Sequence, residues 1–184
     1  MKATEILISE HRIIESVLDS LDIGARKLQR NELVRPGFFL DTADFIKGFA
    51  DGCHHKKEEG VLFKAMVQNG MPQDSGPIGV MLYEHEQGRA YTRKMREAAE
   101  LLQSGDQSAR QGVVQNALGY TELLRQHINK EDNILFPAAD GVIPTAQQDQ
   151  MWKDFEHIEH EETGAGVHEK YLALAEALNK EIRE

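Results

Sequence analysis

Apolar residues recur at steps of three and four along most of the chain, which is the spacing of amphipathic helices. The first such stretch follows Thr4, a residue type that favours an N-cap, and carries Leu7, Ile14 and Leu18 on one face. The sequence NELVRPG then interrupts the pattern, because its Pro-Gly pair marks a turn. The pattern predicts a first helix between Thr4 and this break.

The same spacing predicts three more long helices, at about 39–68, 77–103 and 106–137. Asn69-Gly70 and the loop MPQDSGP end the second helix, Pro77 suits the first turn of the third, and SGD forms the next turn. Short loops between long helices are typical of an up-down-up-down four-helix bundle. We therefore predict an all-α fold in which residues 1–140 form the bundle.

Residues 141–184 have a different character. Thr145 and Gln148 have the spacing of a capping box, and an amphipathic stretch with Met151 and Phe155 follows. TGAG then interrupts the pattern before a last helical stretch, VHEKYLALAEALNKEI. Each of these helices has only a few apolar anchors, so we expect a C-terminal helical extension that packs on the bundle rather than folding alone.

The chain contains an internal repeat. SEHR at 9–12 recurs as YEHE at 83–86, and HHKKEEGVLF at 54–63 is matched by HINKEDNILF at 127–136. Each half is therefore a helical hairpin with one histidine on its first helix and a His-x-x-x-Glu pair on its second. The repeated residues are His11, His54 and Glu58 in the first half and His85, His127 and Glu131 in the second.

This arrangement predicts a site for two metal ions. On a helix, residues four apart lie on one face, so each His-x-x-x-Glu pair can bind one ion or bridge two. A single pair is more often a solvated surface contact. Two pairs in register with two histidines in apolar seams are different, because buried imidazoles and carboxylates need partners. Nitrogen and oxygen ligands suit iron, manganese or zinc.

Composition and charge limit the class of protein. With 184 residues, 40% of them hydrophobic and 28% charged, we expect one globular domain. No apolar run approaches the roughly 18 residues of a membrane span. The start MKATEILISEHR lacks an export signal, and a single cysteine fits a reducing compartment, which favours the cytoplasm. The formal charge of −10 argues against binding to nucleic acid or anionic membranes. Small molecules, cations and other proteins remain as candidate binding partners.

Four segments resemble the hemerythrin-like, or HHE cation-binding, family: SEHR with His11, CHHKKEEGVLF with His54 and Glu58, YEHE with His85, and HINKEDNILFP with His127 and Glu131. The resemblance covers about residues 1–140, and FEHIEHEETGAGVHEKY is similar to the C-terminal helices of longer bacterial members. It implies a four-helix bundle with a non-haem di-iron centre, bridged by two carboxylates and an oxo or hydroxo group. Members carry O2, sense oxygen or iron, respond to nitric oxide and peroxide, or supply iron for cluster repair.

The chain departs from the oxygen-carrying members at one position. Those proteins place two histidines one turn apart on the third helix, whereas here Arg89 follows His85 by one turn and cannot ligate iron. They also place an aspartate five residues after the last histidine, where this chain has Asp132. Because Glu131 aligns with Glu58 in the repeat, we favour Glu131 as the bridge and expect Asp132 to face outward. Reversible carriage of O2 becomes a weaker expectation.

His55 and Tyr120 are candidates for additional roles at the site. His55 lies about 100° round the helix from His54, which favours a surface or interhelix position. In an iron-sensing hemerythrin-like domain of a ubiquitin ligase, however, the residue in this position is an extra acidic ligand. Tyr120 lies two turns before His127 and is expected in the core, where its hydroxyl can hydrogen-bond a bound oxygen species.

Other residues near the motifs have less specific interpretations. The tail can lend His168 to the site, although a solvated acidic face around it is the simpler interpretation. Lys57 and Glu59 are expected to face water or to support the ligands. Cys53 is expected to be a small packing residue rather than a ligand.

We expect a protein that binds or senses O2, NO, peroxide or iron at two iron ions (Fe2+/Fe3+), with manganese or zinc as alternative metals. Other interpretations are an enzyme-like scavenger of peroxide or NO, an iron donor for cluster repair, a reversible O2 carrier and a structural zinc site. The sequence offers no evident substrate pocket or electron-transfer domain, which favours binding and sensing. A protein partner or a homodimer stays open.

Overall fold

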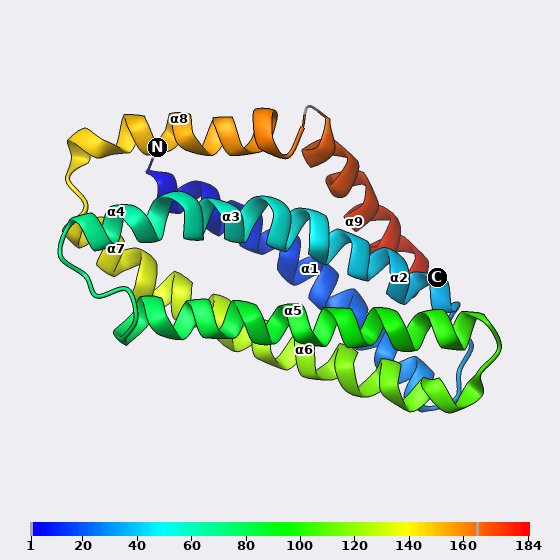
Figure 1. The fold of residues 1–184 in the computed structure, drawn as a ribbon. Helices are drawn as coiled ribbons and strands as arrows, with labels where there is room; N and C mark the ends of the chain where they lie inside the picture. Colours follow the sequence, from blue (N-terminus) through cyan, green and yellow to red (C-terminus); the bar gives the residue numbers. More distant parts are fainter. Residues whose placement is uncertain (1, 165) are drawn as a thin grey trace.

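The computed structural model describes residues 2–164 and 166–184, whose helices form four long antiparallel rods and a C-terminal extension (Figure 1). The rods are α1 (Ala3–Gln29); α2 (Pro36–Phe45), η1 (Ile46–His54), α3 (His55–Lys57), η2 (Glu58–Leu62) and α4 (Phe63–Gln68); α5 (Gly76–Gln103); and η3 (Gln107–Ala109), α6 (Arg110–Lys130), η4 (Glu131–Leu135) and α7 (Phe136–Val142). The extension comprises η5 (Thr145–Gln147), α8 (Gln148–His157), η6 (Ile158–Glu162) and α9 (Val167–Arg183).

The prediction of an all-α four-helix bundle with additional C-terminal helices is confirmed. The described residues form helices and no strand. Within the same residues, none of the helices combines the length and the apolar character that a membrane crossing needs. The second rod begins at Pro36 rather than near residue 39, since a proline is well accommodated in the first turn of a helix.

The fourth rod continues past Pro137, where the sequence pattern predicted its end. Pro137 lies in the first turn of α7, directly after the π-helical turn η4. The missing N–H of a proline costs little there, because η4 already interrupts the regular α-helical hydrogen bonds. The predicted capping box at Thr145 is also wrong. Residues 145–147 form a 3-10 turn, and the Gln148 side chain accepts a hydrogen bond from the backbone N–H of Ala3 instead.

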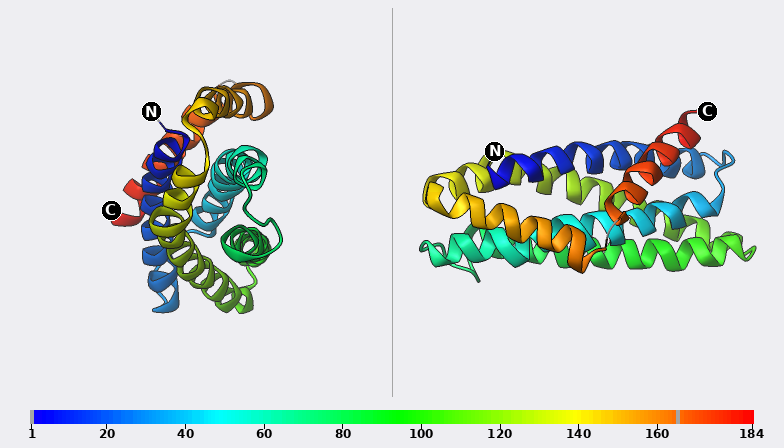
Figure 2. Two further views of the ribbon diagram at one scale, coloured as in Figure 1. Left: turned by 90° about the vertical axis from the view of Figure 1, so that its left-hand side faces the viewer. Right: turned by 90° about the horizontal axis from the view of Figure 1, so that it is seen from above.

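The C-terminal extension lies against the outside of the bundle. Figure 2 shows α8 running along the rods and α9 crossing them at an angle. Residues of α8 contact α1 and η2, and residues of α9 contact α1, α2 and η1. The buried face of α9 includes Tyr171, Ala175, Leu178 and Ile182. Because these side chains are covered by the bundle, the extension shares its apolar core.

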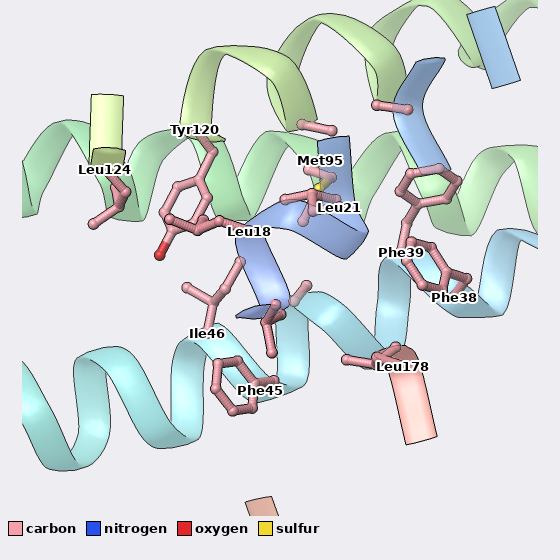
Figure 3. Close-up of a cluster of buried hydrophobic side chains, with 14 of the residues drawn as sticks. Leu18, Leu21, Phe38, Phe39, Phe45, Ile46, Met95, Tyr120, Leu124 and Leu178 are labelled. Atoms are coloured by element: carbon pink, nitrogen blue, oxygen red, sulfur yellow. The ribbon is translucent and has the colours of Figure 1, made fainter. Parts of the chain in front are cut away.

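Two apolar clusters fill the bundle, one on either side of a polar layer. On α1, Leu7 belongs to one cluster and Ile14 to the other, with His11 between them. The other rods repeat this order, so apolar side chains separate the buried histidines from solvent at both ends of the bundle. Figure 3 shows part of the larger cluster, which includes Leu18, Leu21, Phe38, Phe39, Phe45, Ile46, Met95, Tyr120, Leu124 and Leu178.

A glycine allows α9 to lie close to the second rod. A Cβ at Gly48 would lie 1.9 Å from Cζ of Tyr171. We therefore expect Gly48→Ala to lower the free energy of unfolding by about 1–3 kcal/mol, because the ring must be displaced. Urea unfolding of the full chain measures this. Gly141→Ala is the control, since no atom lies within 4 Å of a Cβ at this helical position. Equal stability of the two variants would contradict the tight contact.

Candidate metal centre

The polar layer contains all six residues that the repeat singled out. Their side chains come from the four rods and are at most 2% exposed. Burial of this many ionisable groups is costly unless each finds a partner. The six residues are His11 on α1, His54 in η1, Glu58 in η2, His85 on α5, His127 on α6 and Glu131 in η4.

The carboxylate of Glu58 lies between histidines of the two halves of the repeat. Its Oε1 is 3.4 Å from Nε2 of His54, and its Oε2 is 3.4 Å from Nε2 of His85. The two oxygens of this one side chain therefore face different histidines. A carboxylate in this position can bridge two ions.

Glu131 lies between the same two halves. Its Oε2 is 3.2 Å from Nε2 of His11, and its Oε1 is 3.2 Å from Nε2 of His127. The two glutamates thus divide the layer into a side with His11 and His54 and a side with His85 and His127. The Nε2 atoms of His85 and His127 approach each other to 3.1 Å, as ligand atoms that converge on one position do.

His55 belongs to the layer, so of its two expected positions, at the surface or between helices, the structure has the second. It is 3% exposed, and its ring stacks on that of His85 with 3.9 Å between centroids. Its ligand atom lies within 4.8 Å of those of Glu58, His85 and His127, and a second group with the same spacing comprises His11, His54, Glu58 and Glu131. The 100° between His54 and His55 sends their side chains to opposite sides of the layer.

Several buried polar atoms at the centre of the layer have no hydrogen-bond partner among the described residues. They are Nε2 of His11 and His54 and both carboxylate oxygens of Glu58 and Glu131. Orphaned buried groups of this kind destabilise a protein by about 1–3 kcal/mol each, and more when they are charged. The unpartnered atoms are all good metal ligands and point at one another. The residues present therefore fit a metal centre.

The outer nitrogen of each histidine in the layer is held by a carboxylate. Because a carboxylate can only accept, each Nδ1–H donates, so Nε2 is the nitrogen that faces the layer and that can bind a metal ion once it carries no proton. The distances are 2.7–2.9 Å for the pairs His11–Asp132, His54–Glu10, His55–Asp51, His85–Glu59 and His127–Glu84. This arrangement fixes the tautomer and the ring orientation that metal binding needs.

The supporting carboxylates follow the repeat, although the sequence analysis did not identify Glu10 and Glu84. Each directly precedes a predicted ligand on its own helix, but each holds the histidine of the next rod. The shared Glu-His dipeptide in SEHR and YEHE was the available signal. Asp132 lies outside both groups of buried ligand atoms, in agreement with the expected outward orientation, and it accepts a hydrogen bond from His11 and pairs with Arg12.

Lys57 is buried, which corrects the expectation that it faces water. Its side chain is 1% exposed, and its Nζ lies 2.5 Å from Oε1 of Glu10 and 2.7 Å from Oε2 of Glu159 in η6. Glu10 in turn holds His54. A continuous path of hydrogen bonds thus joins a predicted ligand to the C-terminal extension.

His168 and Tyr120 lie outside both groups of ligand atoms. Nδ1 of His168 is 3.4 Å from Oε1 of Glu159, in a separate group of side chains with Glu10 and Cys53. The ammonium of Lys57 already supplies the positive charge in that group. Tyr120 is 1% exposed and packs at the edge of the apolar cluster (Figure 3), and its hydroxyl has no partner among the described residues. Burial and the charge of Asp51 hold its pKa well above the usual value.

Burial and nearby carboxylates act in opposite directions on the histidines. Burial alone lowers the pKa of His54, but Glu58 and Glu10 outweigh it and raise the pKa to about 10. His127 behaves alike, because Glu131 and Glu84 outweigh burial and raise its pKa to about 9. Burial and the neighbouring His85 instead lower the pKa of His55 well below its usual value, so His55 presents a neutral imidazole.

Comparison with known proteins identifies a family and several relatives of the chain. The family model of the hemerythrin HHE cation binding domain matches residues 2–139. The uncharacterized protein Rv1995 of Mycobacterium tuberculosis is 28% identical over 162 residues, covering 88% of this chain and 63% of that protein. The iron-sulfur cluster repair protein YtfE of Cronobacter sakazakii is 28% identical over 141 residues, which cover 73% of this chain and 62% of that protein. YtfE of Dickeya chrysanthemi is 29% identical over 120 residues, which cover 62% of this chain and 54% of that protein.

These relatives are longer than the chain, which spans less than two thirds of their length. No solved structure matches the chain. The family match extends over most of the chain and includes every histidine and glutamate of the buried layer, whereas the extension from η5 to α9 lies outside it. The chain belongs to the hemerythrin family of HHE cation-binding domains.

Proposed function

We propose that the chain binds two iron ions and uses them to bind or sense O2, NO, peroxide or iron itself. In this proposal Glu58 and Glu131 bridge the ions. The observation that carries it is that each of these carboxylates has one oxygen facing each side of the layer, and that these oxygens have no hydrogen-bond partner within the part of the chain that the structure describes. One ion is held by His11 and His54, and the other by His85, His127 and His55.

The proposed ligands differ between the two sides of the layer. One side has two histidines and the other has three, because His55 has no counterpart in the second half of the repeat, where Ile128 follows His127. Bound ferrous iron would supply electrons to O2, NO or peroxide. The protein orients the ligands through the carboxylates on Nδ1 and excludes water with the two apolar clusters. The side with fewer histidines leaves more positions for a small molecule.

A sensing role is supported by the path from His54 through Glu10 and Lys57 to Glu159. A change in metal occupancy alters the charge at His54, and this path carries the change to the extension. Supply of iron for cluster repair is the second candidate. It is favoured by the similarity to proteins named for iron-sulfur cluster repair, since 28% identity extends over 141 residues.

Anaerobic reconstitution with ferrous iron tests the proposal. We expect about two irons per chain, as in carboxylate-bridged di-iron bundles, and separate changes of the visible spectrum on addition of O2, NO and peroxide. His55→Ala is expected to alter these spectra, while His160→Ala, which changes an exposed histidine of η6, leaves them unchanged. Binding of one zinc and no iron would exclude the proposal. Peroxide turnover far above stoichiometry would favour a scavenging enzyme.

The cellular setting is part of the same proposal. We infer a cytoplasmic protein whose partners are small molecules rather than nucleic acid or membranes, since its formal charge is −10. Transfer of iron to a cluster-free acceptor protein would distinguish a donor from a sensor. A sensor retains its iron, and hydrogen exchange in α8 and α9 then changes with iron loading or gas binding.

A further inference from the structure

A basic pocket opens in the groove between α5 and the second rod. Its volume is about 500 Å³, within the range of pockets that bind small molecules. Arg89, Arg93 and Arg96 line it from one face of α5, and Lys47 faces them from η1. Asp51 is the carboxylate among its lining residues. The pocket therefore collects positive charge on a chain whose formal net charge is −10.

The positive charges of the pocket are only partly neutralised. Arg89 pairs with Glu59 and Glu86, whereas the carboxylate nearest to Arg96 lies 3.9 Å away. Among the described residues, no carboxylate oxygen lies within 4.0 Å of Nζ of Lys47 or the guanidinium of Arg93. Like charges three and four residues apart on a helix repel one another. An anion between them removes this repulsion.

The chemistry of the lining selects small multivalent oxyanions. A guanidinium group presents parallel N–H donors that match two oxygens of a phosphate or carboxylate group. Guanidinium groups at successive turns of α5, facing an ammonium across the groove, can hold more than one such group. The lining also includes the buried, uncharged residues Ala43 and Thr92.

The inner end of the pocket contacts residues that hold the metal centre. Asp51 accepts a hydrogen bond from Nδ1 of His55 at 2.9 Å, and Nε of Arg89 lies 3.6 Å from the same oxygen. Arg89 also donates to Oε1 of Glu59 at 2.7 Å, and that oxygen accepts from His85. An anion that attracts Arg89 must weaken its contacts with Asp51 and Glu59.

We propose that this pocket binds a small multivalent oxyanion, a phosphate or a polycarboxylate, and that its occupancy changes the metal centre through Arg89. The binding step stands on the pocket alone. The coupling step rests on the proposed function, because it requires iron held by His55 and His85.

Calorimetric titration of the full chain with inorganic phosphate, and separately with propane-1,2,3-tricarboxylate, tests the binding step. We expect one saturable site with a dissociation constant below about 1 mM for at least one probe, weakening as salt is added. Arg93→Gln and Arg96→Gln should each weaken binding at least tenfold. Lys94→Gln is the matched control, since Lys94 is an exposed cation of α5 outside the pocket, and binding should change less than twofold.

Outcomes for the two steps are separable. Absence of saturable binding at about 10 mM of either probe overturns the binding step, as does equal weakening by Lys94→Gln. The probe that binds more tightly is then added to the iron-loaded chain. We expect the visible spectrum of the iron to shift, and we expect no shift in the Arg93→Gln variant. Binding without a shift overturns the coupling. Failure to load iron contradicts the proposed function and leaves the titration result valid.

Discussion

Replacing Glu58 or Glu131 by glutamine is expected to lower the iron bound per chain from about two ions to one or none. Each carboxylate faces both sides of the layer, so its removal affects both ions. Glutamine keeps the shape but has one ligand oxygen and no charge. Metal analysis after anaerobic reconstitution and gel filtration measures the result.

The stability of the metal-free chain separates a metal-binding role from a structural one. Without metal, His54 pairs with Glu58 and holds the pKa of that carboxyl well below its usual value, so Glu58→Gln is expected to unfold at a lower urea concentration than the parent chain. A variant that stays folded without urea but binds less iron has lost a ligand rather than its fold. Glu122→Gln, an exposed change on α6, is the control for iron content. If Glu58→Gln and Glu131→Gln both retain the iron content of the parent chain, the bridging assignment is wrong.

Lys57→Met is expected to lower the free energy of unfolding by about 3 kcal/mol, because the buried Glu10 carboxylate loses the ammonium of Lys57 and keeps His54 as a partner. Lys57 is 1% exposed and Glu10, its closest partner, is 4% exposed, so water cannot replace the lost contact. Glu159 loses the same partner, and its contact with α3 is the polar link of the extension to the centre. Urea unfolding measures the change.

The double variant Lys57→Met with Glu10→Gln is expected to recover part of this loss, since the buried carboxylate that lost the ammonium is replaced by a neutral amide. Lys64→Met, at an exposed position of α4, serves as the control and should change stability by less than about 0.5 kcal/mol. A loss as small as that of Lys64→Met would show that Lys57 is solvated. Weaker iron binding by Lys57→Met would further support an effect of Lys57 on His54 through Glu10.

Several features of the centre could be predicted because they depend on local geometry. The His-x-x-x-Glu spacing places two side chains on one helix face whatever the rest of the chain does. The repeat then required the second pair to lie at the same level as the first. Glu58 and Glu131 occupy equivalent positions at the start of π-helical turns in the two halves, in agreement with that symmetry.

Other features depended on how the helices are rotated against one another. His55 is 100° from His54, and from one helix alone this separation is compatible with a surface position or with a position between helices. In the bundle both rings are buried, and they fall in two different groups of ligand atoms that share Glu58. The π-helical turns around them were also not predicted, because a local change in hydrogen bonding leaves no mark in the apolar spacing.

Helical periodicity and the internal repeat were enough to predict the helices and the six residues of the buried layer, since both are properties of positions along the chain. The packed fold was needed to show which carboxylate holds which histidine, that Lys57 is buried, and that a basic pocket includes Asp51, the partner of His55. These contacts join residues from different rods or from the extension, such as Glu10 with His54 and Lys57 with Glu159. Their partners are chosen by the packing of whole helices, which no local pattern records.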